Sequence, residues 1–377
     1  MKKILLINLI FIFIYSCVGP STQGFNLSNS EVARETKIQK EMAISQSLKY
    51  QKRINKVALP LLKDNRDLCG YNITYQLGMT YSSIYDYSNE WREAAKSILN
   101  LDNNCTNCIS GGMTITSITE GSAAEKVGLQ PGDIIVSIND VLVGTTEKEI
   151  KSFRKRYKDI KYKLTDATVK IKRDGLSRNF RFKPDRVCDY PASYYNSDNV
   201  NAYADGSKIM ISRGMMRFIE DDNELALILS HELAHNAMNH MDAKNANAIP
   251  GIMLDMLSAY VGVQTYGMYG DATRNMFSQA FETEADYIAL YFLYRAQFDI
   301  DNSANFWRRM SAENPGSIKQ NHNSTHPSTP ERYLRIEKTI EEIYAKEKNG
   351  EAVKPNAVIP NTGPRKGAWD KKGSSWD

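Results

Sequence analysis

Residues 231–235 read His-Glu-Leu-Ala-His, a spacing that can bind a metal ion and activate water. On an α-helix, His231 and His235 project from the same face about one turn apart, so two imidazole nitrogens can hold one Zn²⁺. Glu232 lies beside that position, where its carboxylate can accept a proton from a water whose pKa the metal has lowered to about 7. The motif therefore predicts a metal-dependent hydrolase with Glu232 as general base.

The sequence around this motif predicts the helix that its side chains need. Residues 223–230 are rich in helix formers, with apolar residues at a helical period and nothing that breaks a helix. The chain has only five histidines, all in its C-terminal part, at positions 231, 235, 240, 322 and 326. This clustering favours a metal site over core histidines without a chemical role.

Zinc held by two histidines needs a third protein ligand, and the sequence offers two candidates. Glu282 lies on a second predicted helix, in the segment Phe-Glu-Thr-Glu-Ala-Asp. Asp286, four residues later, shares its face and can orient an imidazole from behind, whereas Glu284 fits a solvated acidic face. His240 is the alternative third ligand, but we favour it as a helix-end residue or as a partner behind the ligands.

A further segment, His326-Pro327 followed by Arg332, completes a resemblance that covers roughly residues 187–345. Together these motifs resemble the gluzincin metallopeptidase family that includes HtpX, BepA, the mitochondrial Oma protease and the type I CAAX prenyl endopeptidases. The resemblance implies an α+β fold with a mainly helical zincin-type domain and a small β-sheet. It also implies one Zn²⁺ per chain. The implied zinc ligands are His231, His235 and Glu282.

The resemblance also implies how a substrate is held. An edge strand is expected to pair with an extended peptide through backbone hydrogen bonds, which give affinity without demanding one sequence. The residues of this expected strand are Asn201, Ala202, Tyr203 and Ala204. Arg332, on a predicted helix, can pair with a carboxylate such as Asp286 or stabilise a developing oxyanion.

His326 lies in a loop rich in Asn, Ser, Thr and Pro that cannot form a core element. Pro327 restricts it to extended backbone angles, so that its ring can reach outward. We hypothesise that His326 occupies the fourth zinc position and holds the enzyme latent until a substrate or partner moves the loop. The alternative is that His326 caps the next helix or contacts solvent.

The amino-terminal residues resemble a bacterial lipoprotein signal. A charged start precedes an apolar run at 4–14 that is too short for a comfortable membrane span. We expect a signal peptide at 1–16, lipidation of Cys17 and a polar tether at 17–30. Plain cleavage or an uncleaved anchor is the alternative, because a bulky tyrosine lies two residues before the cysteine. Val18, in place of Asp, favours the outer membrane, facing the periplasm.

Export changes how the other cysteines are interpreted. Cys69, Cys105, Cys108 and Cys188 form an even set, and an oxidising periplasm permits disulfide bonds. The simplest pairing is a long-range bridge from Cys69 to Cys188 and a local one from Cys105 to Cys108. The Cys-Thr-Asn-Cys segment can also be a redox pair or half of a zinc site, but no second such pair supports either.

A second module lies between those cysteines. The signature Gly-Leu-Gln-Pro-Gly-Asp-Ile-Ile follows a predicted strand at 111–118 and precedes a predicted helix at 146–158 and a hairpin at 167–182. This pattern resembles a bacterial PDZ domain over residues 105–186, inserted in the peptidase. The implied function is a groove, between that first strand and the helix, for a peptide strand or chain terminus. The alternative is a spacer that only packs on the protease.

The remaining segments complete the expected domain organisation. We expect residues 31–104 to form a largely helical region that packs on the peptidase at 187–345, and residues 346–377 to form a disordered polar tail. The apolar run at 249–269 is interrupted by Pro and polar residues, so we expect a helix or loop covering the cleft. A net charge of +4 over 377 residues, without a concentrated basic patch, argues against a nucleic-acid partner.

These features predict a zinc-dependent endopeptidase of the bacterial cell envelope, anchored to the membrane by lipid. By family analogy alone, its substrates are unfolded or misassembled envelope proteins, and its partners include the outer-membrane assembly machinery. The rival prediction is a non-catalytic, chaperone-like lipoprotein that binds clients through the PDZ groove and the edge strand. Cleavage that stops with a chelator supports the enzyme, and client binding unaffected by zinc removal supports the rival.

Cys17→Ser should release the protein from membranes, because each buried methylene of an acyl chain adds about 0.8 kcal/mol of membrane affinity and the serine carries no such chains. Membrane fractionation and intact mass measurement test this. A wild-type mature protein without lipid mass at Cys17 would refute the anchor.

Overall fold

A computed structural model describes most of the chain in two compact units, Met1–Lys40 and Glu41–Asp377, whose boundary falls within helix α2 (Asn29–Asp64). Among the described residues, no helix is both long and apolar enough to cross a membrane. Cys17, Cys105, Cys108 and His326 lie outside the described residues, as does the predicted signal peptide. The described residues are 22, 24–99, 112–260, 264–266, 268, 271, 278–313, 330–357 and 360.

Helix α2 matches the predicted N-terminal helix. In the first unit a capping box begins it, because Ser28 Oγ accepts from the Glu31 amide at 3.2 Å and the Glu31 carboxylate accepts from the Ser28 amide at 2.8 Å. In the second unit its apolar residues Ile54 and Leu61 recur at a helical period and are buried in the main core.

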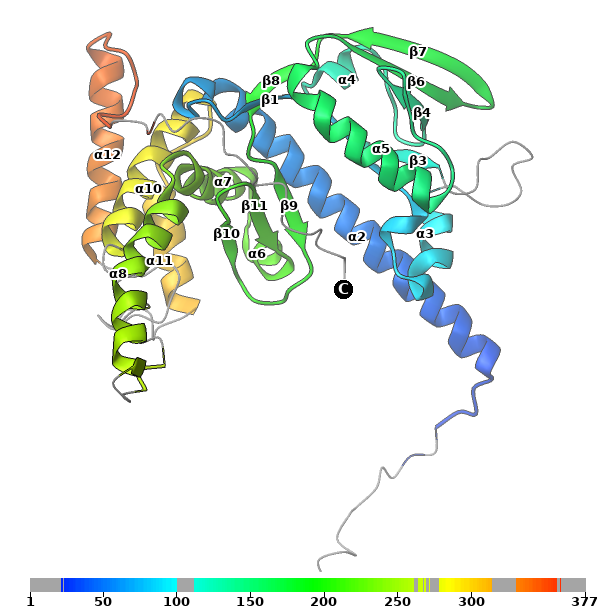
Figure 1. Cartoon of the computed structure of the whole chain (residues 1–377), viewed down its shortest axis with the longest axis horizontal. Coiled ribbons are helices and arrows are strands. Elements are labelled where there is room, and N and C mark those ends of the chain that lie inside the picture. Colours follow the sequence, from blue (N-terminus) through cyan, green and yellow to red (C-terminus); the bar gives the residue numbers. More distant parts are fainter. Residues whose placement is uncertain are drawn as a thin grey trace, which may run out of the picture. The chain divides into compact units, whose positions relative to one another are not determined.

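The domain that carries the His-Glu-Leu-Ala-His motif, and that the sequence predicts to be the catalytic domain, is built around one core in which α7 (Asp222–Ala237) packs against α10 (Ser278–Arg295), as Figure 1 shows. The Asp221 carboxylate begins α7 by accepting from the Glu224 amide at 2.9 Å. From Leu225 onward α7 is buried on all sides, which explains its apolar sequence. The other helices of this domain are α6 (Arg213–Phe218), α8 (His240–Tyr260), α11 (Ser303–Glu313) and α12 (Pro330–Lys348).

A small sheet beside α7 has the strand order β10-β11-β9, so β10 lies at one edge. Its pairing is antiparallel between β10 and β11 and parallel between β11 and β9. The predicted edge strand at 201–204 begins one residue later than expected, because the Asn201 amide donates to Ser212 Oγ at 3.2 Å. The strands are β9 (Ala192–Tyr195), β10 (Ala202–Ala204) and β11 (Ile209–Ser212).

The PDZ module has its own core under a sheet in the order β2-β3-β4-β6-β7, with β5 paired to β4. A two-residue turn joins β6 and β7 through Asp174 and Gly175, both with positive φ (52° and 78°), as the predicted hairpin requires. Its elements are β2 (Met79–Ser82), β3 (Met113–Ile118), α4 (Ala123–Lys126), β4 (Ile134–Ile138), β5 (Val141–Leu142), α5 (Glu147–Ile160), η4 (Lys161–Lys163), β6 (Ala167–Arg173) and β7 (Leu176–Phe182).

Strand β2, the first strand of this sheet, belongs to the PDZ module although it lies before residue 105, where that module was expected to begin. We expected residues 31–104 to pack on the peptidase, but β2 pairs antiparallel with β3, and Leu77 just before it is buried in the PDZ core. Strand β3 is therefore flanked by β2 and β4, so the predicted groove beside it was wrongly placed. No sequence pattern reveals this pairing, because β2 and β3 are not joined by a short hairpin turn.

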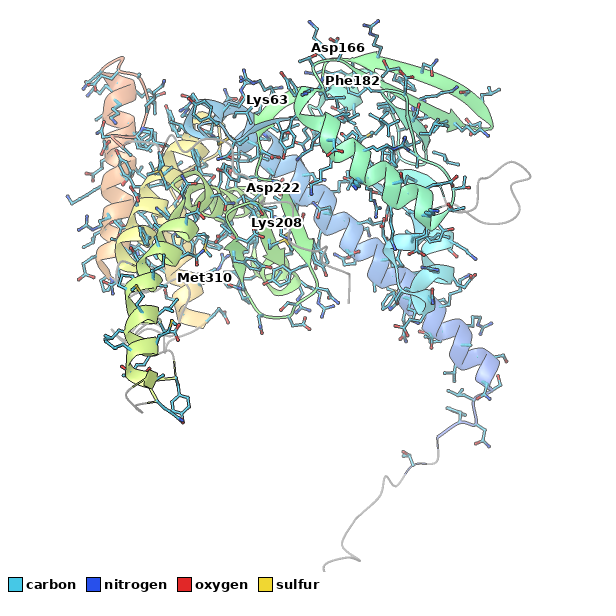
Figure 2. The ribbon with its side chains drawn as sticks, viewed as in Figure 1. Lys63, Asp166, Phe182, Lys208, Asp222 and Met310 are labelled. Atoms are coloured by element: carbon cyan, nitrogen blue, oxygen red, sulfur yellow. A yellow bond between two sulfur atoms is a disulfide. The ribbon has the colours of Figure 1, made fainter. Side chains whose placement is uncertain are left out.

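The connecting elements tie the PDZ module to the catalytic domain. β1 pairs antiparallel with β8, which directly follows the PDZ sheet in the chain. Lys63, at the end of α2, lies 2.7 Å from Asp185 Oδ1, and Figure 2 labels this lysine. These elements are η1 (Arg66–Leu68), β1 (Ile73–Gln76), η2 (Ile84–Asp86), η3 (Asn89–Trp91), α3 (Arg92–Ile98) and β8 (Asp185–Cys188).

Two predicted segments take defined positions. The apolar run that begins at residue 249 lies in the second half of α8 up to Tyr260, in agreement with the expected helix. Helix α12 extends through Lys348, and the Asn356 amide donates to the Tyr287 hydroxyl at 2.9 Å. The start of the expected tail at 346–377 therefore packs on the catalytic domain, because α12 and α10 offer it hydrogen-bond partners.

A disulfide bond joins Cys69 to Cys188, the long-range pair proposed from the sequence. Replacing both cysteines with serine should lower the free energy of unfolding by up to about 5 kcal/mol, since the bond closes a loop with a sequence separation of 119 residues in the unfolded chain. Urea denaturation measures the change. Free thiols at both positions in the wild-type protein, found by non-reducing peptide mapping, would contradict the bridge.

Candidate metal centre

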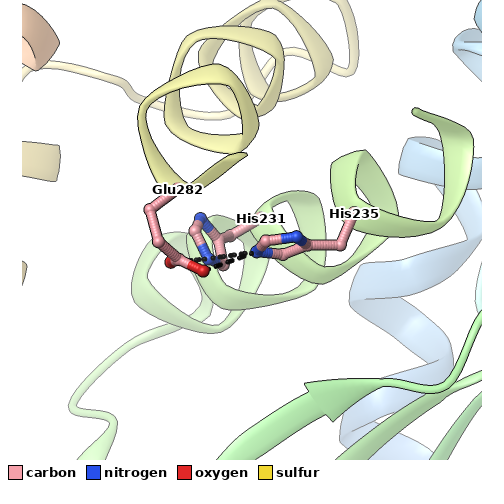
Figure 3. A group of neighbouring side chains, drawn as sticks. All are labelled: His231, His235 and Glu282. Atoms are coloured by element: carbon pink, nitrogen blue, oxygen red, sulfur yellow. Dashed lines mark hydrogen bonds and ion pairs between the residues drawn. The ribbon is translucent and has the colours of Figure 1, made fainter. Parts of the chain in front are cut away.

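The packing of α7 on α10 brings three metal-binding side chains together, as drawn in Figure 3. His231 Nε2 and His235 Nε2 are 3.1 Å apart. Glu282 faces both rings, with Oε2 3.2 Å from His231 Nε2 and Oε1 3.3 Å from His235 Nε2. All three side chains are buried, so solvent does not screen the charge they carry.

These separations fit one zinc ion. Zn–N bonds of about 2.0–2.1 Å in a tetrahedron place ligand atoms about 3.3 Å apart. The two imidazole nitrogens are 3.1 Å apart, and each lies 3.2–3.3 Å from an oxygen of the Glu282 carboxylate, close to that value. A tetrahedral ion with three protein ligands keeps one position for water or substrate. The donor set, two imidazoles and a carboxylate, is one that zinc uses in catalytic sites.

The outer nitrogen of His231 is held by a buried carboxylate. His231 Nδ1 lies 2.9 Å from Asp286 Oδ1, so its Nε2 is directed toward Glu282. Burial alone would lower the pKa of His231, but the hydrogen bonds to Asp286 and Glu282 outweigh that effect and raise it to about 9. A metal ligand must be a neutral imidazole, so a cation at this site competes with that proton.

Arg332 of α12 pairs with Asp286, the first of the two roles considered for it. Its Nη2 lies 2.8 Å from Asp286 Oδ1, and its Nε donates to Asp286 Oδ2. Burial opposes ionisation of Asp286, yet Arg332 and His231 together lower the pKa of this carboxyl. The guanidinium also stacks on Trp307 at 4.3 Å, and the edge of the Trp307 ring contacts His231.

His240, the alternative third ligand, lies behind His235. The two Nδ1 atoms are 2.8 Å apart, so the His240 ring is separated from the metal position by the His235 ring. His240 Nε2 is 2.9 Å from Glu284 Oε2. The sequence predicted a solvated acidic face for Glu284 and gave no signal of its link to His240. That link depends on how α8 meets α10.

Asn236 is a functional residue that the sequence reasoning missed. Its Oδ1 accepts from the Gly206 amide at 2.8 Å, and its Nδ2 donates to the Lys208 carbonyl at 3.1 Å. These bonds attach the β10–β11 turn to the helix that carries both histidines; Lys208 is labelled in Figure 2. The available sequence signal was an amide side chain directly after His235 on a mainly apolar helix. In the structure this amide is fully buried, and buried polar groups need partners.

Glu232 lies between the two histidines on α7 and is 2% exposed. Because β10 packs beside α7, a carboxylate, a metal-binding triad and an exposed strand edge lie in one region. Tyr203, the central residue of β10, is 38% exposed. The arrangement can hold an extended peptide and hydrolyse it, provided that a metal is bound.

Comparisons with known proteins agree with this geometry. Residues 164–340 match Peptidase family M48, and residues 114–153 match a PDZ domain. The mitochondrial metalloendopeptidase OMA1 of Schizosaccharomyces pombe is 31% identical over 147 residues, which cover 37% of this chain and 43% of that protein. The beta-barrel assembly-enhancing protease of Yersinia pestis is 28% identical over 138 residues, which cover 32% of this chain and 28% of that protein.

The chain spans less than half the length of these curated relatives. Among solved structures, the HtrA3 PDZ domain bound to a phage-derived ligand is 16% identical, and the match covers 30% of this chain and 89% of that chain, with a TM-score of 0.22.

Family M48 peptidases are zinc-dependent, in agreement with the His-His-Glu cluster. The predicted α+β class and family resemblance are confirmed. The region of this chain that carries the metal-binding residues matches Peptidase family M48, and the chain joins it to a region that matches a PDZ domain.

Proposed function

We propose that this chain is a zinc-dependent endopeptidase of the bacterial cell envelope. The observation that carries the proposal is the convergence of His231, His235 and Glu282, with donor separations that suit one zinc ion, beside the buried Glu232. The match to Peptidase family M48 over residues 164–340 supports the same activity.

Each residue at the site has a chemical role in this proposal. A Zn²⁺ ion held by His231, His235 and Glu282 would polarise the scissile carbonyl and make water a better nucleophile. Glu232 accepts the proton of that water and passes it to the leaving amine. Asp286, fixed by Arg332, holds His231 in the tautomer whose Nε2 lone pair faces the metal.

The substrate is an extended polypeptide. Among the described residues β10 pairs only with β11, so its outer backbone groups are available to a peptide strand. Because Asn236 attaches the β10–β11 turn to α7, a bound peptide keeps a fixed distance from Glu232. Backbone pairing selects for segments that can extend, which favours unfolded proteins over folded ones.

We propose that the PDZ domain binds a peptide strand or chain terminus along β2 and beside α5. Strand β2 is the end strand of the described sheet, and Ile150 and Phe153 of α5 pack into the core beneath it. The segment after β2 returns to α5, where Asp86 pairs with Arg154 at 2.6 Å. A peptide at this groove would increase the local concentration of substrate at the metal centre.

The envelope location rests on two supports. Cys17 follows a short apolar segment typical of a lipoprotein signal. One group of relatives is named beta-barrel assembly-enhancing protease, which favours misassembled envelope proteins as substrates and the outer-membrane assembly machinery as a partner. Lipid attachment at Cys17 would hold the enzyme at the outer membrane, facing the periplasm.

Glu232→Gln should lower cleavage of an unfolded protein such as casein by about 10²–10⁴-fold, because the amide cannot accept the proton of the attacking water. Zinc content should stay near wild type, since the amide is nearly isosteric with the carboxylate. Peptide release and metal analysis measure both. Equal cleavage by the variant would contradict the mechanism, and client binding that survives zinc removal without any cleavage would favour a chaperone-like protein.

Glu282→Ala should lower zinc occupancy itself, since it removes one of the three donors. Thr283→Ala, at the neighbouring position of α10, serves as the control and should keep its zinc. Metal analysis of the two purified variants distinguishes them. A full zinc complement in Glu282→Ala would transfer the role of third ligand to another residue, with His240 first in line.

His326→Ala should raise basal cleavage without loss of zinc if its ring blocks the open zinc position. His322→Ala, a histidine of the same segment, is the matched control and should leave the rate unchanged. Initial rates with a fluorogenic peptide give the comparison. Unchanged or reduced cleavage in His326→Ala, with zinc retained, would count against this latch.

A further inference from the structure

The two histidines of α7 have different partners at their outer nitrogens. His231 Nδ1 is held directly by the carboxylate of Asp286. His235 Nδ1 is held by a second imidazole, that of His240, at 2.8 Å. The far nitrogen of His240 then lies 2.9 Å from Glu284 Oε2. The second carboxylate of the Glu-x-Glu segment is thus connected to the metal position through two rings.

Hydrogen-bond chemistry fixes the direction of this connection. A neutral His235 that gives its Nε2 lone pair to a metal carries its hydrogen on Nδ1 and must donate it. His240 Nδ1 therefore accepts, so the neutral His240 ring carries its hydrogen on Nε2 and donates it to Glu284. The Glu284 carboxylate accepts this last hydrogen, so every donor along the chain of bonds meets an acceptor.

The His240 ring is held in place by packing. It is 1% exposed, and the Phe281 ring lies against it with centroids 4.7 Å apart and a tilt of 31°. Phe281 directly precedes the metal-binding residue Glu282, so one segment of α10 supplies both a metal donor and the face that orients His240. The ring therefore has little freedom to choose another hydrogen-bond partner.

Glu284 differs from Asp286 in its environment. Its side chain is 41% exposed, and it lines a cavity of about 1010 Å³ that is also lined by Glu331 and Arg335. A carboxylate at the end of such a chain fixes the tautomer and orientation of the imidazoles, and partners of this kind typically change metal affinity 10- to 100-fold. Because Glu284 is not part of the buried core, its side chain can be changed without creating a cavity.

We propose that Glu284 is a positioning residue for zinc, acting through His240 on His235. The inference rests on the proposed function in that it takes His231, His235 and Glu282 as the zinc ligands. Glu284 holds the tautomer of His240, which holds the tautomer and ring orientation of His235. The two ligand histidines are therefore oriented by two different carboxylates of one helix, the buried Asp286 and the partly exposed Glu284.

The experiment measures zinc affinity by competition with a chelator, in the full-length protein and without substrate. Glu284→Gln should bind zinc about 10-fold more weakly, because the neutral amide accepts more weakly than a carboxylate and can also turn its NH₂ group toward His240, so that it no longer fixes the tautomer. Glu331→Gln, which removes the same charge from the same cavity, should bind like wild type. The melting temperature of the metal-free Glu284→Gln protein should equal that of wild type, because no buried packing is lost.

Cobalt substitution adds a spectroscopic readout that a purely structural role would not change. The visible absorption of Co²⁺ depends on the ligands around it, so Glu284→Gln should alter the spectrum and Glu331→Gln should not. His240→Gln, whose amide keeps one acceptor and one donor, should retain more affinity than His240→Phe, which keeps the ring volume and loses both bonds.

Equal affinity and an unchanged cobalt spectrum in Glu284→Gln would overturn the inference, as would an equal loss in Glu331→Gln. A wild-type protein that binds zinc and cleaves no peptide would overturn the proposed function and leave this inference intact. A wild-type protein that binds no zinc would overturn both.

Discussion

The catalytic domain depends on one constraint: two carboxylates of helix α10, Glu282 and Asp286, are buried and need partners. Removing a carboxylate from water costs several kcal/mol unless it finds partners. The histidine rings of α7 and the guanidinium of Arg332 on α12 supply them, so three helices must pack together for either charge to be tolerated. The same packing creates the metal site, and stability and chemistry therefore have one origin.

Helix α7 carries more than the ligands. Through Asn236 it is attached to the turn beside β10, so hydrogen bonds join the helix of the metal position to the exposed strand edge. Substrate geometry in a peptidase has to be held within fractions of an ångström, because misplaced reacting groups lose large factors in rate. The PDZ sheet, by contrast, is joined through β1, β8 and the Cys69–Cys188 bridge, at a distance in sequence from the catalytic motif.

Local patterns predicted the parts of the fold that depend on local chemistry. The spacing of His231 and His235 placed both on one helix face, and Asp174-Gly175 specified a hairpin turn. Strand β2 could not be found, because its partner is distant in sequence and no turn links them. Glu284 is partly exposed, as expected, but its bond to His240 could not be predicted, because it depends on how α8 meets α10, which no periodicity encodes.

X-ray absorption spectroscopy at the zinc edge of the purified protein tests the central claim most directly. The account predicts a four-coordinate ion with two imidazole nitrogens and a carboxylate oxygen at about 2.0–2.2 Å. Replacing His231 or His235 should remove one imidazole from the shell, and replacing both should remove all imidazole scattering. Sulfur scatterers at about 2.3 Å, or a shell without imidazole, would place the metal elsewhere in the chain and contradict the account.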